Sequence, residues 1–485
     1  MNFELWEPVI GLEIHVQLNT KSKLFSRAPN RFGDEPNTNI SETDTGQPGS
    51  LPVLNKEVVR KAVQFGLAAK ATIRRISSFD RKSYFYPDSP RNFQITQFYE
   101  PLIQGGTITC DVGGHTRHFS LNRAHIEDDT GMLKHFTGFA AIDYNRAGVP
   151  LIEIVSEPCI FSPKEATAYA MSIKSIMEYL DASDCNMEEG SLRIDVNISV
   201  RLKTEKILRP KIEIKNLNSF HYMELALEAE FLRQVRAYTM FPHENHKVAV
   251  AAGTYRFDPE KKETILMREK EEAKDYRYFP EPDLVPLILT EAYLEEVRLS
   301  LPELPHQRYL RYLSEHKLPA DAAAILVNDK YLSDFFEEAL EVCRSPVPLC
   351  NWLIVEFAGR LKELGKTLKE SGLKSRYVAH LVKMIESGAI TGKIAKLVAD
   401  EMVLHPGKDS ELIVRENPDF QPVHDRKAIE PFVDQVLREN TQSIADFKAG
   451  KTRAFGFLVG QVMKLTQGKA SPEVVNALLN QKLQE

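Results

Sequence analysis

A short segment near the N-terminus alternates strictly between apolar and polar residues. Residues 10–18 read IGLEIHVQL, so the apolar side chains share one face of a strand while Glu13, His15 and Gln17 share the other. The apolar face requires burial, which constrains the segment to a sheet packed on a core. Glutamate and histidine both bind metals and move protons, so the polar face is a candidate site.

Three later segments repeat this alternation. They are 151–158 (LIEIVSEP) with Glu153 and Glu157, 192–202 (LRIDVNISVRL) with Arg193 and Asp195, and 211–217 (KIEIKNL) with Glu213 and Lys215. Between the first two strands, residues 125–131 (HIEDDTG) predict an acidic loop that contains Glu127. The polar faces together either line one cavity or form a solvated antiparallel face, and the pattern leaves both interpretations open.

The chain changes character after Pro286. Before it, strands dominate and two helices interrupt them, one from Pro163 behind an N-cap Ser162 with Glu165 at N3, the other over about 222–238. From about 290 onward, the 3.6-residue periodicity of helices replaces alternation. We therefore predict an α+β chain: a strand-rich, mostly antiparallel cradle domain (1–292), an all-α helical domain (293–410) and a small all-α tail domain (411–485).

Composition bounds the class of protein. A chain of 485 residues is too long to fold around a single hydrophobic core. Its contents of 43% hydrophobic and 27% charged residues are typical of a globular protein. A net charge of −6 argues against nucleic-acid binding by the whole chain, so any such role must be local. Five cysteines without a CxxC pair argue against a disulfide framework. With no signal-peptide pattern and no long apolar run, we expect a cytoplasmic protein that does not enter a membrane.

Aromatic and basic residues are interleaved in residues 79–88 (FDRKSYFYPD), which contain Arg81 and Lys82. Such a mixture can stack a base and hold phosphate. The alternative is a β-hairpin whose tyrosines pack as cross-strand neighbours. A second block of this kind, DYRYFPEPD, occupies residues 275–283.

The usual signatures of nucleotide and hydrolase sites are missing from the sequence. There is no GxxxxGK[ST], no GxGxxG after a strand, no HExxH and no GxSxG. Carboxylates with one histidine instead suit a loosely held divalent ion that leaves room for water and phosphates. Such an ion with nearby Arg or Lys would support phosphoryl transfer. The residues alone therefore predict a polar, metal-binding cradle joined to helical domains.

The last segment is locally basic. From residue 448 to the end, six cations face two carboxylates; the cations are Lys448, Lys451, Arg453, Lys464, Lys469 and Lys482. Such an excess can contact a phosphate backbone. The alternative is an ordinary solvated face.

Several long motifs together resemble the B subunits of the bacterial aspartyl/glutamyl-tRNA amidotransferases. They occur in order as GLEIHVQL, PGSLPVLN, FDRKSYFYPD, LIEIVSEP, MEEGSLRIDVNISVR, EIKNLNS and DYRYFPEPD, with GFLVGQVM near the C-terminus. The likeness runs nearly from end to end, and so many long motifs in one order are far more specific than any single pattern.

The resemblance implies a reaction on glutamate or aspartate that is mischarged onto the tRNA for glutamine or asparagine. It implies that ATP and Mg²⁺ serve to phosphorylate the side-chain carboxylate in the cradle. A glutaminase A subunit then supplies ammonia, which displaces phosphate, and a small C subunit completes a heterotrimer. The helical and tail domains are expected to hold the misacylated tRNA.

Site residues follow from the matched motifs. The resemblance implies the metal ligands His15, Glu127 and Glu153, with Glu13 beside them. It also implies that Asp195, Lys215 and Arg193 line the cavity, and we assign Glu13, Glu127, Asp195 and Lys215 to catalysis. Nucleotide binding is assigned to Arg193, Arg81 and Lys82, and tRNA binding to Lys448, Lys451, Arg453 and Lys464. At Asp128 the chain reads Glu-Asp-Asp where relatives often have Glu-Glu-Asp.

One departure concerns zinc. Many relatives carry a Cys-x-x-Cys pair of a zinc site just before PGSLPVLN, where this chain has Ser41 and Asp44. We therefore expect no structural zinc, and packing or hydrogen bonds must hold this corner. Two other functions are weighed: a non-catalytic tRNA-binding scaffold, which would not need the carboxylates at 13, 127 and 153, and a metallohydrolase, for which the sequence has no zinc signature or nucleophile.

Overall fold

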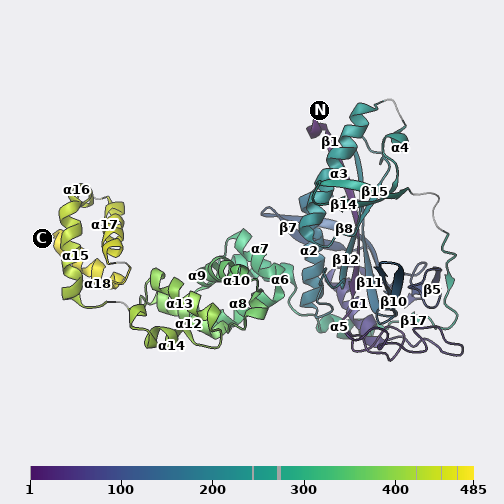
Figure 1. Cartoon of the computed structure of the whole chain (residues 1–485), viewed down its shortest axis with the longest axis horizontal. Coiled ribbons are helices and arrows are strands. Elements are labelled where there is room, and N and C mark those ends of the chain that lie inside the picture. The colour runs from purple at the N-terminus through teal and green to yellow at the C-terminus, as the bar shows by residue number, and fades with distance from the viewer. Residues whose placement is uncertain are drawn as a thin grey trace. The chain divides into compact units, whose positions relative to one another are not determined.

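The computed structural model describes residues 2–242, 245–269, 275–421, 423–448, 451–466 and 468–484. The chain divides into two compact units, Met1–Arg308 and Tyr309–Glu485. The first contains the sheets and the second is helical (Figure 1). This confirms the predicted α+β class, with a mostly antiparallel strand-rich part followed by helices.

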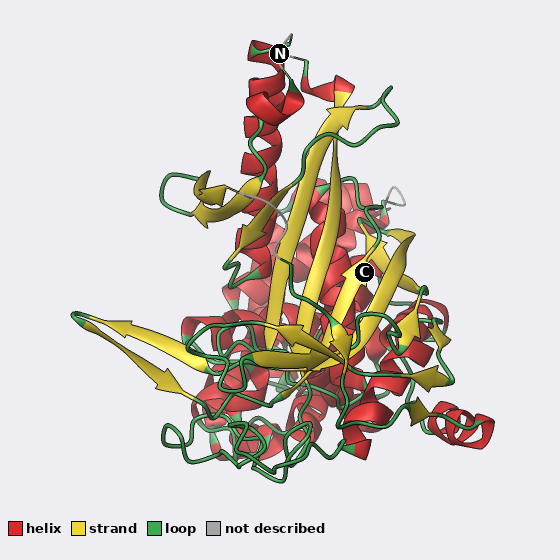
Figure 2. Cartoon of the chain, turned by 90° about the vertical axis from the view of Figure 1, so that its right-hand side faces the viewer, coloured by secondary structure: helices red, strands yellow, loops and turns green. Residues whose placement is uncertain are grey.

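One large sheet organises the first unit (Figure 2). Its strands lie in the order β15 (Glu263–Glu269), β14 (Gly253–Asp258), β13 (Ile212–Lys215), β12 (Leu192–Leu202), β1 (Trp6–Gln17), β11 (Pro150–Ser156), β8 (His115–Asp128), β6 (Ile103–Gln104) and β2 (Thr72–Ile73), with β7 (Thr107–Val112) paired to β8. Of the described neighbours in this sheet, β13 and β14 alone run parallel. The predicted strands at 10–18, 151–158, 192–202 and 211–217 are β1, β11, β12 and β13.

Short strands and helices complete this unit. The small sheets are β16 (Phe279–Pro280), β4 (Asp80–Ser83) and β5 (Phe93–Thr96); β9 (Met132–Phe136) and β10 (Phe139–Asp143); and β17 (Leu287–Ile288) and β3 (Ile76–Ser77). The helices are η1 (Phe3–Leu5), α1 (Lys56–Ala68), α2 (Pro163–Tyr179), α3 (Phe220–Met240), α4 (His246–Ala249) and α5 (Glu291–Leu299), followed by α6 (Pro305–Ser314), which straddles the division.

The start of α2 follows the predicted capping pattern. Ser162 accepts a hydrogen bond from the backbone N of Glu165, and Pro163 opens the first turn. The helix ends at Tyr179. The second predicted helix is α3, which begins behind an N-cap at Ser219.

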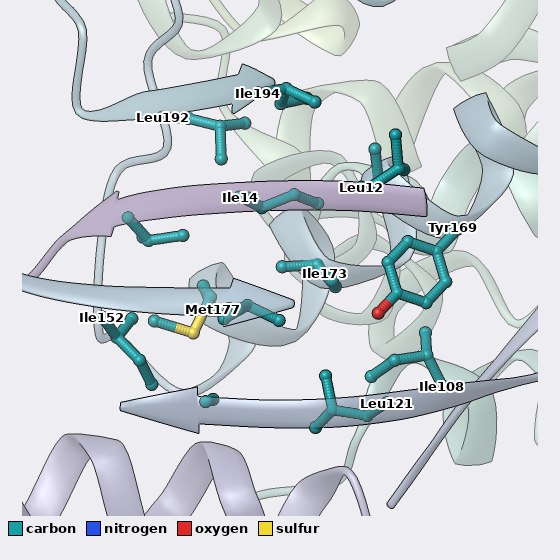
Figure 3. Close-up of a cluster of buried hydrophobic side chains, with 14 of the residues drawn as sticks. Leu12, Ile14, Ile108, Leu121, Ile152, Tyr169, Ile173, Met177, Leu192 and Ile194 are labelled. Atoms are coloured by element: carbon teal, nitrogen blue, oxygen red, sulfur yellow. The ribbon is translucent and has the colours of Figure 1, made fainter. Parts of the chain in front are cut away.

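The apolar faces of the strands form the core against α2. Leu12 and Ile14 of β1 are almost wholly buried, and Ile173 and Met177 of α2 face them (Figure 3). Figure 1 shows α2 and α3 along one side of the sheet, with β5 and β10 on the other. Each fully buried side chain of this kind stabilises the fold by about 1.5–3 kcal/mol. Because this face is covered, the alternate residues of β1 must project from the opposite face.

The second unit is built from helices around two separate buried clusters. Its elements are α7 (Ala320–Asn328), α8 (Lys330–Cys343), α9 (Pro346–Asn351), the π-helical turn η2 (Trp352–Phe357), α10 (Ala358–Glu363), α11 (Leu368–Ser371), α12 (Ser375–Glu386), α13 (Gly392–Leu404), α14 (Ser410–Glu416), η3 (Pro418–Phe420), α15 (Arg426–Glu439), α16 (Thr441–Lys448), α17 (Thr452–Leu465) and α18 (Pro472–Gln484). Within the described ranges, none of the helices has both the length and the apolarity needed to cross a membrane.

Candidate active site

The polar face of β1 meets polar residues on both neighbouring strands. In the antiparallel register, His15 lies opposite Glu153 of β11 and opposite Arg193 of β12. Glu13 lies opposite Asp195 of β12. Directly opposed residues of antiparallel strands project from the same face. The sheet therefore brings together residues that are about 140 to 180 positions apart in the sequence.

Glu127 enters the same group from β8. Glu153 lies opposite His125, and Leu151 lies opposite Glu127. The prediction of an acidic loop over 125–131 is wrong for its first half, because β8 continues to Asp128. Hydrogen bonds explain the longer strand: β11 pairs with it on one side, and Asp128 Oδ1 accepts from the backbone N of Ile95 on β5.

One imidazole and two carboxylates converge at the centre of this face. His15 Nε2 lies 3.6 Å from Glu127 Oε1 and 3.4 Å from Glu153 Oε2. One ligand atom from each of the three residues lies within 4.8 Å of the others. Both glutamates are buried, and Thr96 Oγ1 donates a hydrogen bond of 3.1 Å to Glu127 Oε2. We call His15, Glu127 and Glu153 the central cluster.

The pKa values of the central cluster show mutual stabilisation of charge. Burial alone would lower the pKa of His15, but the hydrogen bond and charge of Glu153, with the charge of Glu127, raise it to about 9. Burial opposes ionisation of Glu153, yet His125 and His15 hold its pKa well below the usual range. The pKa of Glu127 is also lowered against burial and the charge of Glu153. Two buried carboxylates thus depend on nearby positive charge, which is the requirement that a bound cation satisfies.

His125 belongs to this site but was not predicted as a site residue. It is buried, and its Nε2 lies 3.6 Å from Glu127 Oε2 and 3.5 Å from Glu153 Oε2. Its Nδ1 has no hydrogen-bond partner in the described part of the chain. The spacing of His125 and Glu127 could have indicated this role, because residues two positions apart in a strand share one face.

A second polar group lies beside the central cluster. Lys215 Nζ lies 2.6 Å from Asp195 Oδ2 and 3.1 Å from Glu213 Oε1. Glu13 offers a carboxylate oxygen within 4.8 Å of ligand atoms of His15 and Asp195. Burial and the neighbouring Glu153 raise the pKa of Glu13. The pKa of Lys215 is raised despite burial, because Asp195 and Glu213 stabilise its charge.

The three cations predicted to bind nucleotide have different surroundings. Arg193 Nη2 lies 2.9 Å from Asp129 Oδ2. Arg81 is paired with Glu281 at 2.7 Å and with Asp283 at 3.1 Å. Lys82 Nζ lies 5.0 Å from the centre of the Tyr276 ring, and the charges of Glu127 and Glu153 contribute to raising its pKa against burial. Of the three, Lys82 is the one whose charge stabilises both glutamates of the central cluster.

A cavity of about 880 Å³ adjoins Lys215. Aromatic and basic side chains dominate its lining, which includes Tyr84, Phe85, Tyr86, Lys215, Arg268, Tyr276 and Arg277. The two aromatic–basic blocks of the sequence therefore meet at one cavity. Aromatic faces can stack a base, and cations can hold phosphate.

The predicted tRNA-binding residues lie in the second unit. Lys448 ends α16, Lys451 pairs with Asp446 at 3.0 Å, and Arg453 and Lys464 project from α17. All four are exposed. They form part of the bundle whose core includes Leu458 and Val462.

Comparison with known proteins gives two family matches. Residues 8–295 match the family described as "GatB/GatE catalytic domain". Residues 334–483 match the family described as "GatB domain". The first match contains every residue of the central cluster and of the group around Lys215.

Similar proteins extend over almost the whole chain. A protein of Protochlamydia amoebophila is 64% identical over 99% of this chain and 97% of its own length. A protein of Chlamydia abortus is 60% identical over 98% of this chain and 97% of its own length. Both are named as the B subunit of an aspartyl/glutamyl-tRNA(Asn/Gln) amidotransferase.

Proposed function

This chain belongs to the B-subunit family of the aspartyl/glutamyl-tRNA(Asn/Gln) amidotransferases, and from that premise we propose that its central cluster activates a carboxylate for amidation. The protein is the B subunit of a tRNA-dependent amidotransferase, a ligase that forms a carbon–nitrogen bond. The observation that carries the proposed role is the convergence of His15, Glu127 and Glu153 from three neighbouring strands.

The central cluster fits Mg²⁺. Two ionised carboxylates neutralise a divalent charge, and the three donors occupy part of a coordination sphere, which leaves positions for water and phosphate. The carboxylates of Glu153 and Glu127 raise the pKa of His15, so the central cluster favours a positive charge at this position. When bound, Mg²⁺ would neutralise charge on the phosphoryl group in transfer. His15, Glu127 and Glu153 would hold it.

The proposed reaction makes a poor electrophile reactive. A carboxylate oxygen of glutamyl- or aspartyl-tRNA attacks the γ-phosphorus of ATP, ADP leaves, and an acyl phosphate forms. Ammonia then attacks the acyl carbon, phosphate leaves with the C–O bond electrons, and loss of a proton gives the amide. Lys215, held by Asp195 and Glu213, and Lys82 are the cations available to stabilise the developing negative charge.

We assign ATP to the 880 Å³ cavity beside Lys215. Its aromatic side chains would stack the base, while Lys215, which lines the cavity and pairs with Asp195, would bind the phosphates on the side of Glu13 and the central cluster. Arg81, Arg193 and Lys215 all have acidic partners, but of the three Lys215 alone is among the residues that line the cavity. Arg81 and Arg193 would therefore contribute to this site mainly by fixing the strands around it. This assignment moves the expected phosphate contacts from Arg81 and Arg193 to Lys215, and it keeps Lys82.

The relatives' name implies a complex of several subunits that acts with tRNA. We propose that a glutaminase A subunit delivers ammonia, that a small C subunit completes a heterotrimer, and that the complex works in the cytoplasm. Residues 1–292 would catalyse, while 293–410 and 411–485 hold the misacylated tRNA through cations that include Arg453 and Lys464.

A non-catalytic tRNA-binding scaffold is the competing proposal. Two carboxylates kept buried side by side are costly without a charged ligand, and a scaffold gains nothing from them. The deciding assay combines the purified complex with ATP, glutamine and either Glu-tRNA(Gln) or Asp-tRNA(Asn). We expect amide formation that requires ATP and Mg²⁺, and the two tRNAs show which substrate is used. Amidation that proceeds equally well without ATP would refute the proposed activation.

A further inference from the structure

Asp44 is a buried carboxylate on which several donors converge. It lies between β1 and α1, and 3% of its surface is exposed. Its Oδ2 accepts hydrogen bonds from Ser26 Oγ at 3.1 Å, Ser41 Oγ at 3.0 Å and Ser41 N at 3.0 Å. Lys23 Nζ lies 3.4 Å from the same oxygen, and the Lys23 side chain is fully buried. One oxygen atom, Asp44 Oδ2, therefore links Lys23, Ser26 and Ser41.

The groups around Asp44 do not fit the zinc ion that is expected in the many relatives with a Cys-x-x-Cys pair at this position. A structural zinc requires four ligands with free lone pairs, from Cys, His or carboxylates. Here the neighbours of Asp44 are two hydroxyls, a backbone N–H and an ammonium, which all act as hydrogen-bond donors to it. The sequence has no cysteine or histidine between residues 16 and 109. Lys23 supplies the positive charge at this position.

Lys23 also reaches the turn before β11. Its Nζ donates to the carbonyl oxygen of Ala147 at 2.6 Å and approaches that of Tyr144 at 3.5 Å. The neighbouring Leu24 N donates to Gly148 O at 3.0 Å. Both contacts fasten residues 144–149 immediately before the strand that carries Glu153.

The other side of this turn is bonded to the acidic end of β8. Gly148 N donates to Asp129 O at 2.9 Å, and Asp129 N donates to Val149 O at 2.8 Å. The Asp129 carboxylate accepts hydrogen bonds from Arg193 and Gln17. Asp44 Oδ1 would lie 2.6 Å from a Cβ at position 148, where φ is +84°, so glycine permits this close approach.

We propose that Lys23 and Asp44 are positioning residues of the active site, which hold the 144–149 turn and through it Asp129 and the start of β11 without a metal ion. The inference rests on the proposed function, because its effect is read in amidation. Neither residue touches the central cluster. Their influence passes through backbone hydrogen bonds of the turn to the two strands that carry Glu127 and Glu153.

Lys23→Met tests the positioning role in the reconstituted complex. We expect kcat for amidation to fall roughly ten- to hundredfold, because small displacements of reacting groups have effects of that size. The KM for tRNA and the glutaminase rate stay unchanged. Arg31→Met is the matched control, since it removes a cation of the same segment whose side chain is 67% exposed and paired with Asp34. An unchanged kcat in folded Lys23→Met, below its melting temperature, would overturn the proposal.

A second variant covers the case in which Lys23→Met does not fold. Lys23→Met/Asp44→Asn removes both charges and keeps an oxygen that can accept from Ser26 and Ser41. We expect a folded complex with a low kcat. Full recovery of kcat together with folding would show a role in stability alone and overturn the positioning role. Failure of the proposed function would appear differently, as a wild-type complex without ATP-dependent amidation.

Metal analysis tests the second half of the proposal. Zinc is measured in the wild-type complex and in the complex with Asp44→Asn, before and after 1,10-phenanthroline and return to Mg²⁺ buffer. We expect the same zinc content in both complexes and amidation that survives the chelator. One zinc ion per copy of this chain that is lost with Asp44→Asn would overturn the metal-free assignment.

Discussion

His15 Nε2 lies 3.4 Å from Glu153 Oε2, and this same oxygen is approached at 3.5 Å by Nε2 of His125. One carboxylate oxygen thus lies between two imidazoles in a buried part of the sheet. A proton on His15 and a divalent cation are alternative sources of the positive charge that Glu127 and Glu153 require. The proposed Mg²⁺ would compete with this proton, so the response of the site to mutation and to pH tests the proposal.

Glu127→Gln removes one charge from the central cluster with little change of shape. We expect ATP-dependent activation of the substrate carboxylate, trapped with hydroxylamine, to fall by roughly a hundredfold or more, because charge stabilisation by a metal is worth several kcal/mol. The glutaminase activity of the complex stays largely intact. Glu157→Gln is the control, since Glu157 directly follows β11, the strand of Glu153, but accepts a hydrogen bond from Asn122 instead. Amide formation that survives Glu127→Gln would refute the metal assignment.

The raised pKa of His15 predicts a pH-dependent affinity for Mg²⁺. A histidine with a folded-state pKa of about 9, against an ordinary value of 6.5, stabilises the metal-free protein fully below pH 6.5 and loses this contribution as pH rises through 9. Mg²⁺ requires the neutral imidazole, so its affinity should rise over the same range. Glu127 and Glu153 have lowered pKa values and remain ionised there.

Thermal melting with and without Mg²⁺ from pH 6.5 to 9 measures this competition. We expect the Mg²⁺-induced rise in melting temperature to increase with pH in the wild type and to be smaller and flatter in His15→Gln. His125→Gln is measured in parallel, because His125 contacts the same carboxylates. His118→Gln, which alters an imidazole bonded to Thr109 at 2.9 Å on β7, serves as the control. An equal pH response in His15→Gln and the wild type would contradict the assignment.

Lys215→Met tests the cation beside the proposed nucleotide cavity. Loss of its charge should lower kcat by about a hundredfold, as for removal of a single donor that stabilises transition-state charge. Lys215→Arg should restore part of the rate, because its charge can still pair with Asp195 and Glu213. Lys174→Met removes a cation of α2 that pairs with Glu178 and should leave kcat unchanged. Equal rates for Lys215→Met and the wild type would exclude a role in catalysis.

The alternation of β1 and β12 was enough to predict which side chains share a face. Burial of Leu12 and Ile14 leaves Glu13 and His15 on the opposite face, and that relation depends on local geometry alone. The capping residues Ser162 and Glu165 likewise determine the start of α2 locally. Such features can be read directly from neighbouring residues.

Partners across the sheet could not be read in this way. Alternation within one strand does not determine which residues of two strands lie opposite each other. The local sequence therefore cannot predict that His15 pairs with Glu153, or that Arg81 pairs with Glu281, 200 residues away. His125 was overlooked because a run of acidic residues resembles a loop, whereas pairing with β11 keeps it in a strand. Sequence therefore supplied candidate side chains, and long-range pairing decided which of them meet.

The exposed cations of α17 predict salt-dependent tRNA binding. Arg453→Ala/Lys464→Ala should weaken binding and reduce the slope of log affinity against log salt by about two, since each phosphate contact contributes about 0.9 for a duplex. Deletion of the residues after 420 should have a larger effect. The cut falls after Phe420 because Ile413 and Phe420 pack into the core of the preceding helices. Lys174→Ala, in the first unit, is the control for loss of a cation. Filter binding of tRNA at several salt concentrations measures the slope, and an affinity that is unchanged at both low and high salt would refute a tRNA-binding tail.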